Sequence, residues 1–145
     1  MLVDDVTKRI SEKITVLEGR VKSAADLAEL VRQKKMPQSS VAAFVLPLGL
    51  RPRDQGNAGT GYFIQSIDDT IGIILVIRNA NDITGGKALP TIETLRDELI
   101  TNLAGWIPGD EIGGFRVSRG QLLSAIDGTV IYQLDFTIQI QVRNT

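Results

Sequence analysis

The sequence predicts an α+β fold: a mostly antiparallel β-sheet with a long helix and an N-terminal helix packed on one face. Two segments place apolar residues at helical spacing, one near the N-terminus and one over 89–104. The C-terminal segment VIYQLDFTIQIQVR alternates between apolar and polar side chains, as a strand with one buried face does. The Asp127-Gly128 pair before it is a strong hairpin signal, because this dipeptide suits a tight turn between strands.

Helices are expected in three places. The first covers 4–16, with acids before bases, which suits the helix dipole. The second follows a short strand in RVKSA, begins with the capping residues Ser23 and Asp26, and ends before Pro37. The third covers 89–104. The apolar positions are Val6, Ile10, Ile14 and Leu17 in the first helix and Leu89, Ile92, Leu95, Leu99 and Leu103 in the third.

The remaining apolar segments read as strands. VAAFVLPLG is expected to be a buried strand, and YFIQSIDD follows after a polar segment. TIGIILVIRN is apolar on both faces, which predicts a central strand covered on both sides. Asp68-Asp69 is read either as a turn between two paired strands or as a bulge within one long strand. Near the C-terminus, 121–127 is expected to pair antiparallel with 129–143.

Composition excludes several function classes. A length of 145 residues fits one domain, 1–145, and a net charge of −1 gives no basic excess for nucleic-acid binding. The chain has no cysteine and no histidine, which removes thiolate chemistry, the commonest general base and the commonest transition-metal ligand. The acidic start does not resemble a signal peptide and the apolar runs are short, so we expect a soluble, intracellular protein.

No motif predicts catalysis or cofactor binding. GGK at 85–87 lacks the glycine and the Ser or Thr of a phosphate loop, because Asn81 and Ala88 stand at those positions. GNAGTG at 56–61 has the wrong spacing for a dinucleotide fingerprint and precedes a strand. No Ser-x-x-Lys arrangement occurs. We therefore expect no enzyme activity, and no catalytic or cofactor-binding residues.

Two internal pairs of acids are candidate metal sites. Asp68-Asp69 and Asp110-Glu111 carry oxygen ligands that Mg²⁺ or Ca²⁺ accept. Neighbouring residues on a strand point to opposite faces, however, and no further acids converge on either pair in sequence. Solvated turns are the favoured interpretation, and no metal site is predicted.

A long glycine-rich loop is predicted at about 49–61. Most connections in compact domains are about 4–6 residues long, and long structureless loops are usually functional. Apart from Leu50 this segment is almost entirely polar, so it has no core of its own. We expect it to contact a neighbouring subunit or another protein; the alternative is a mobile loop. The candidate interface residues are Arg51, Arg53, Asp54, Gln55 and Asn57.

The last strand presents a face of nearly uncharged polar side chains. Such a face suits a polar subunit interface or the wall of a channel, whereas exposed sheet faces usually carry more charge. The alternative is a strand face that is merely solvated. Its members are Gln133, Asp135, Thr137, Gln139 and Gln141. Trp106, the only tryptophan, is interpreted as a cap on the core, with an interface anchor as the alternative.

The order of these segments resembles the tail terminator proteins of tailed bacteriophages. The resemblance rests on GRVKSAADLAEL, on VAAFVLPLG before a polar loop, on LVIRNANDITGGKA before IETLRDELITNLAGWIP, and on GGFRVSRGQLLSAIDGTVIYQLDFTIQ. Together these cover nearly the whole chain. The most family-like signature is L-x-G-W-x-P, at Leu103, Gly105, Trp106 and Pro108.

The resemblance implies a structural virion protein that forms a hexameric ring on the head-proximal end of the tail tube. Such a ring ends polymerisation of the tube, and of the sheath if the tail is contractile, and offers the docking surface for the neck. The implied partners are further copies of the chain, the tube protein, a head–tail connector or neck protein and, in contractile tails, the sheath. DNA would pass through the channel without specific binding, and no cofactor or membrane partner is implied. The implied location is the neck-proximal end of the virion tail, and the host cytoplasm during assembly.

Two other readings stay open. A tail tube or head–tail connector protein would have a similar virion role. A small ligand-binding or enzymatic α+β domain would use the glycine-rich loop as a lid, and a deep pocket with a metal held by Asp68, Asp69 or Asp110 would favour it.

Overall fold

A computed structural model describes residues 2–37, 40–59, 61–78, 89–109 and 113–144. Within these ranges the helices are α1 (Leu2–Lys13), the short 3-10 helix η1 (Thr15–Leu17), α2 (Ala24–Gln33) and α3 (Leu89–Leu103). The strands are β1 (Val21–Ser23), β2 (Val41–Pro52), β3 (Phe63–Arg78), β4 (Arg116–Ile126) and β5 (Thr129–Asn144). They form one sheet in the order β1-β2-β3-β5-β4, in which only β1 and β2 are parallel. The predicted α+β class is confirmed.

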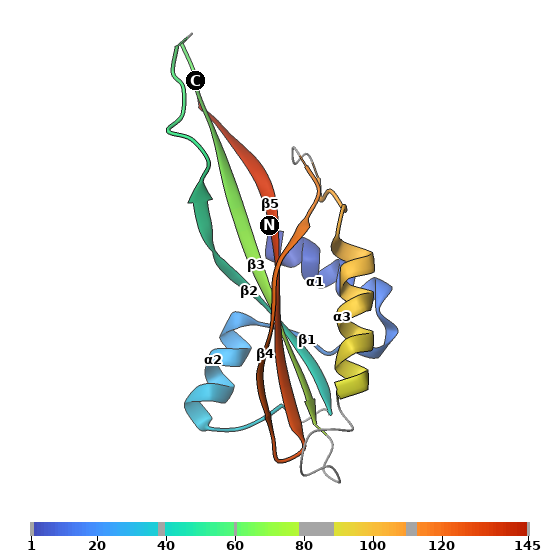
Figure 1. Cartoon of the computed structure of the whole chain (residues 1–145). Coiled ribbons are helices and arrows are strands. Elements are labelled where there is room, and N and C mark those ends of the chain that lie inside the picture. The colour runs from blue at the N-terminus through green and yellow to red at the C-terminus, as the bar shows by residue number, and fades with distance from the viewer. Residues whose placement is uncertain (1, 38–39, 60, 79–88, 110–112, 145) are drawn as a thin grey trace.

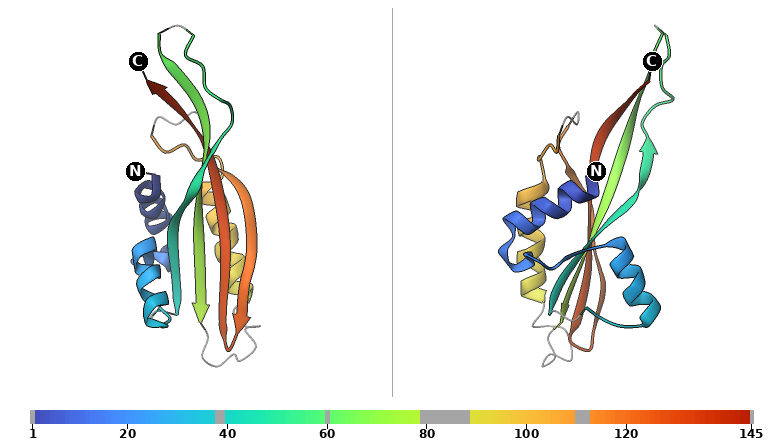
Figure 2. Two further views of the ribbon diagram at one scale, coloured as in Figure 1. Left: turned by 90° about the vertical axis from the view of Figure 1, so that its left-hand side faces the viewer. Right: turned by 180° about the vertical axis from the view of Figure 1, so that it is seen from behind.

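The helices cover the two faces of the sheet unequally (Figures 1 and 2). Helices α1 and α3 pack on one face, which we call the front face, and α2 packs on the other, the back face. The predicted packing of the long and N-terminal helices on one face is thus confirmed. As its apolar sequence predicted, β3 is buried on both sides: Ile73 and Leu75 belong to the main core, and Ile74 and Val76 to a smaller cluster under α2.

The helix boundaries follow local signals. At the start of α2, the Ser23 hydroxyl accepts a hydrogen bond from the Asp26 backbone N–H at 3.2 Å, and the Asp26 carboxylate accepts one from the Ser23 N–H at 3.0 Å. This capping box was predicted in outline, and the Ser23 N–H lowers the pKa of Asp26. Helix α1 ends at Lys13, earlier than predicted, because the chain tightens into η1 and still buries Ile14 and Leu17 completely.

The strands are longer than their local signals indicated. Asp68 and Asp69 lie in the middle of one continuous β3, so they form neither a turn nor a bulge. Strand β2 continues to Pro52, so the beginning of the segment predicted as a loop over 49–61 is strand. A shift in the pairing register between Pro47 and Gly49 makes this possible, because it lets one extra residue leave the ladder. The GGK segment at 85–87 lies outside the described residues.

The predicted C-terminal hairpin is confirmed. Strands β4 and β5 pair antiparallel across the turn at Asp127 and Gly128. The backbone φ angles of these two residues are 54° and 76°, which lie in the left-handed region. Tyr132, Leu134, Phe136, Ile138 and Ile140 of β5 all face the main core, as the alternation predicted.

Part of the sheet extends beyond the helices (Figure 2). The ends of β2, β3 and β5 project as a three-stranded arm, whose tip carries the connection over 53–62 and lies close to the C-terminus (Figure 1). We call residues 47–70 and 137–144 the arm. Its strands remain paired out to Phe63 and Asn144. At the base of the arm, Ile138 and Ile140 still pack against the main core. Beyond that base the arm presents two sheet faces that no described helix covers in the views of Figures 1 and 2.

The segment after α3 is held by close backbone packing. The Gly105 N–H donates to the Phe115 carbonyl at 2.7 Å, and the Phe115 N–H donates to the Trp106 carbonyl at 3.0 Å. The Trp106 ring stacks on Phe115 with 6.0 Å between centroids, and the Arg9 guanidinium lies 4.7 Å from the Trp106 centroid. Trp106 packs against the main core, which confirms its interpretation as a cap.

Gly114→Ala tests this packing. A Cβ at Gly114 would lie 2.6 Å from the Gly105 backbone, which no side-chain rotation relieves. We expect a loss of about 1–3 kcal/mol in the free energy of unfolding, measured by urea denaturation. Gly113→Ala is the matched control, because a Cβ there meets nothing within 4 Å. Equal losses in both variants would contradict the close approach of Gly114 to Gly105.

Candidate functional site

The arm has two chemically different faces. Side chains alternate along each strand, and because Ile71 and Ile73 point into the main core, Asp69 and Ile67 lie on the same front face. Leu50 pairs with Asp69 and shares this face, whereas Arg51 pairs with Asp68 on the back face. The remaining front-face positions include Phe63, Ile140 and Val142, and the back-face positions include Ser66, Thr70, Gln139 and Gln141. One face is therefore mainly apolar and the other polar.

A charged cluster links the strands on the back face. Asp68 is 18% exposed and stands between two arginines: Arg53 Nε lies 2.8 Å from Oδ1, and Arg116 Nη2 lies 3.2 Å from Oδ2. Arg53 also donates a hydrogen bond to Gln139 Oε1 at 2.9 Å. These residues come from the tip connection and from β3, β4 and β5. The cluster thus connects the tip of the arm to three strands.

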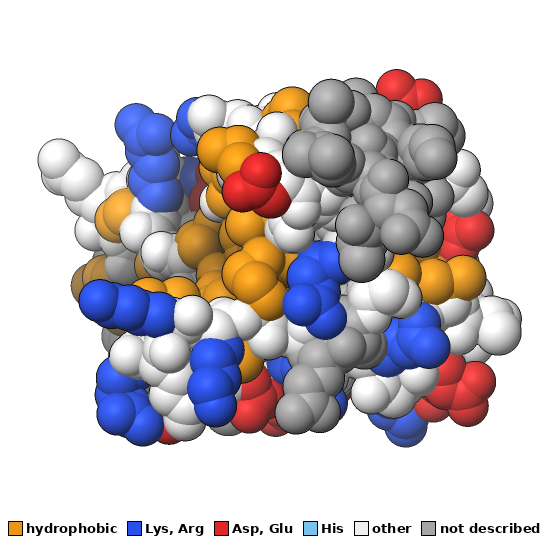
Figure 3. Space-filling model, turned by 90° about the horizontal axis from the view of Figure 1, so that it is seen from below, with side chains coloured by type: hydrophobic (Ala, Val, Ile, Leu, Met, Phe, Trp, Pro, Cys, Tyr) orange, Lys and Arg blue, Asp and Glu red, His pale blue; other side chains and the backbone are white. Residues whose placement is uncertain are grey.

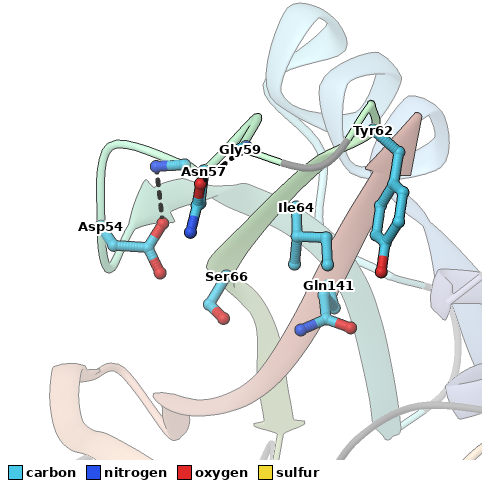
Figure 4. Close-up of a pocket in the computed structure, with 8 residues that line it drawn as sticks. Asp54, Asn57, Gly59, Tyr62, Ile64, Ser66 and Gln141 are labelled. Atoms are coloured by element: carbon cyan, nitrogen blue, oxygen red, sulfur yellow. Dashed lines mark hydrogen bonds between the residues drawn. The ribbon is translucent and has the colours of Figure 1, made fainter. Parts of the chain in front are cut away.

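The connection at the tip is ordered by its own polar side chains (Figure 4). Asp54 Oδ1 accepts from the Gly56 N–H at 2.8 Å, and Asn57 Oδ1 accepts from the Gly59 N–H at 2.9 Å. The backbones of Asn57 and Ile64 bond to each other at 2.8 and 2.9 Å. The connection is therefore tied back to β3.

A hollow of about 420 Å³ lies beside this connection, between it and the ends of β3 and β5. Amide, hydroxyl and apolar groups line it, with one carboxylate: Asp54, Asn57, Tyr62, Ile64, Ser66 and Gln141. Nothing in this set pairs a nucleophile with a base.

The structure separates the five loop residues proposed from the sequence. Arg53, Asp54 and Asn57 take part in the internal contacts described above. Arg51 and Gln55 are exposed, and within the described ranges no acidic side chain lies within ion-pair distance of Arg51. Sequence reasoning missed the partner of Arg53, because it left Asp68 either in a turn or in a bulge and gave it no cross-strand neighbours. The interface role of these residues stays a prediction.

The polar face of β5 is partly internal. All five positions lie on the back face, but Asp135 and Thr137 are buried, with 7% and 4% of their surface exposed. Gln133 Nε2 donates to Asp135 Oδ1 at 2.9 Å, and the hydroxyl of Thr137 lies 2.9 Å from that of Thr70. Gln133, Gln139 and Gln141 remain half-buried.

Leu48 and Gly72 contribute to the burial of Asp135. A Cβ on Gly72 would lie 2.8 Å from Leu48 Cδ1 and 3.0 Å from Asp135 Oδ1, so both side chains lie over the glycine. This part of the polar face was predicted to be an interface or channel wall, a role that stays a prediction. The sequence could not show that Leu48 covers this site. Leu48 is the extra residue at the register shift of β2, and that shift depends on the pairing of β2 with β3.

The acids do not assemble into a metal centre in the part of the chain that the structure describes. No three of its His, Cys, Asp and Glu residues come together. Asp68 and Asp69 point to opposite faces, as the strand geometry predicted, and burial raises the pKa of Asp69. Asp110-Glu111 lies outside the described residues. Over the same ranges, no helix is long and apolar enough to cross a membrane.

Arg53→Ala tests whether the charged cluster orders the tip. The substitution removes both the contact with Asp68 and the hydrogen bond to Gln139. We expect amide exchange at Asn57 and Ile64 to become roughly fivefold faster, which corresponds to about 1 kcal/mol for a partly exposed ion pair. Arg51→Ala is the control, since it removes an arginine on the same arm that has no ionic partner among the described residues. Faster exchange of similar size in the control would contradict a specific role for the cluster.

The comparison with known proteins agrees with the resemblance found in the sequence. No curated protein matches the chain closely enough to count as a relative. A family model described as "Phage tail terminator protein" matches residues 2–145, which include every helix and strand described above. Members of this family are structural proteins of the phage tail. This chain therefore belongs to the phage tail terminator protein family.

Proposed function

We propose that this protein is the tail terminator itself: a hexameric ring on the head-proximal end of the tail tube. The ring stops polymerisation of the tube, and of the sheath in a contractile tail, and offers the surface on which the neck docks. The observation that carries this proposal is the family match over residues 2–145. Its partners are then further copies of the chain, the tube protein and a connector or neck protein.

The chemical difference between the two ends of the subunit supports this role. A ring that stops growth must present one surface to the tube and a different one to the neck. The arm ends in a polar tip, whereas Figure 3 shows hydrophobic side chains gathered at the opposite end, with Lys and Arg side chains around them. Exposed apolar residues of α2, of the segment after it and of β4 are Val31, Met36 and Ile126.

The uncovered faces of the arm also suit a ring. An apolar sheet face is normally buried against another layer of the structure. Neighbouring subunits in a ring would supply that layer. We assign Arg51, Arg53, Asp54, Gln55 and Asn57 to contacts with a neighbouring subunit or the tube, and the half-buried Gln139 and Gln141 to an interface or the channel wall.

The low net charge suits a channel through which DNA passes. Lys and Arg contacts with phosphates supply most non-specific affinity for DNA, so a channel that does not retain DNA has few of them. A net charge of −1 agrees with this requirement.

Light scattering tests the assembly over a range of protein and salt concentrations. A hexamer of 15.8-kDa subunits has a mass of about 95 kDa. We expect a discrete species of this mass, either for the protein alone or once tail tubes are added. Long heterogeneous polymers would identify a tube protein instead. A monomer that ignores tubes at every concentration would contradict both roles.

Tube growth tests termination directly. Preformed tail tubes are mixed with tube subunits, with or without this protein, and tube lengths are measured by electron microscopy. We expect growth to stop when about one ring per tube has been added, because a terminator acts only at the tube end. Unchanged lengths with bound rings would exclude termination and favour a connector role.

A further inference from the structure

Asp69 is a half-buried carboxylate without a cationic partner in the described part of the chain. It lies at the base of the arm on the front face, between Ile67 and Ile71 along β3 and opposite Leu50 and Ile138 on the neighbouring strands. Burial raises the pKa of Asp69, so the folded subunit disfavours its charge. A charged carboxylate in apolar surroundings destabilises the folded subunit unless another molecule supplies a cation to pair with it.

Arg51 is the complementary group on the back face. Its side chain is exposed, and the neighbouring Asp68 is already in contact with Arg53 and Arg116. This part of the back face therefore carries three arginines and one aspartate, whereas Asp69 stands on the front face. The two faces of the arm are complementary in charge.

The two residues also lie at the same level of the arm. Leu50 pairs with Asp69 and Arg51 with Asp68, so Arg51 and Asp69 are offset by one residue, or about 3.3 Å, along the strands. Because this offset is only one residue, a contact between Asp69 of one copy and Arg51 of the next would relate successive copies mainly by rotation, with little rise along the arm. A closed ring requires such a heterologous contact, whereas a rise would produce a helical filament.

Each face of the arm also has an exposed leucine in addition to its charged residue. Leu50 is 62% exposed beside Asp69, and Leu48 is 44% exposed on the back face. Packed sheets lie about 10 Å apart, a gap that an arginine and an aspartate side chain span together.

From these observations we propose that Asp69 of one copy pairs with Arg51 of the next, so that the arms pack front face to back face around the ring. The pair would set the level at which successive arms meet. This inference rests on the proposed ring and names one contact within it.

Charge exchange tests the pair. Asp69→Lys and Arg51→Glu should each raise the protein concentration needed for ring formation at least tenfold, measured by sedimentation velocity in low salt. The double variant Asp69→Lys/Arg51→Glu should recover most of this loss, because it restores opposite charges in the reverse order. Lys8→Glu is the control for charge reversal, since the Lys8 side chain is 77% exposed and belongs to α1, which contributes no residue to the arm. It should leave ring formation unchanged.

Asp69→Asn separates an assembly role from a structural one. Because the raised pKa means that the charged form is less favourable in the folded subunit than in the unfolded chain, the amide should increase the melting temperature of the monomer at pH 7. The same variant should weaken the ring. A residue that merely supported the fold would lower the melting temperature instead, and that result would overturn the proposal.

The outcomes distinguish this pair from the ring itself. If Asp69→Lys and Arg51→Glu each form rings normally, the proposed contact between these two residues is wrong, while the proposed function is unaffected. The proposed contact is also wrong if both single variants form rings poorly and the double variant does not recover ring formation. A wild-type protein that never forms rings, even with tubes, would overturn the proposed function and this contact with it.

Discussion

The unbroken pairing of β3 with β5 is the constraint on which the rest of the structure depends. It runs from Phe63 opposite Asn144 to Arg78 opposite Thr129 without a shift in register. A slip of one residue would turn every side chain of a strand to the other face and expose the core. The register that buries Ile73 and Leu134 therefore also places Asp68 and Asp69 on opposite faces of the arm. The chemistry of the arm is a consequence of core packing elsewhere in the same strands.

The outer strands adapt to this pair by local irregularities. Strand β2 shifts its register between Pro47 and Gly49, and β4 shifts twice against β5. Such bulges bend and twist a strand without disturbing its neighbour. Beyond its base no described helix covers the arm in Figures 1 and 2, and the cluster around Asp68 adds polar contacts to the pairing of its strands. Its stability within the isolated subunit is therefore more sensitive to salt than that of the core.

Much of the fold could be predicted because its signals are local. The capping pair Ser23 and Asp26, the Asp127-Gly128 turn and the alternation along β5 each act over a few residues. The course of β2 to Pro52 could not be predicted, because glycine and proline usually mark turns and the register shift that accommodates them depends on β3. The same holds for Asp68-Asp69, whose place within a strand is fixed by pairing on both sides.

The candidate site was less predictable than the fold. Sequence reasoning identified polar residues at the arm, but the contact of Arg53 with Asp68 and Arg116 joins positions far apart in the chain. The burial of Asp135 depends on Leu48 reaching across Gly72. Contacts of this kind follow from the tertiary register and leave no local pattern. The polar face of β5 was therefore recognised as unusual, while its division into buried and half-buried parts was not.

The size of the arm faces limits what they can contribute to a ring. Near the base of the arm, each face offers one well-exposed leucine and one charge that has no ionic partner among the described residues. This is a small contact compared with the roughly 1,200–2,000 Å² of a stable interface. Charge pairs of this kind guide orientation and exclude wrong registers more than they add affinity. The arms would therefore set the angle and level of neighbouring subunits. Most of the binding energy of the proposed ring would then come from other surfaces, or from contacts with the tube.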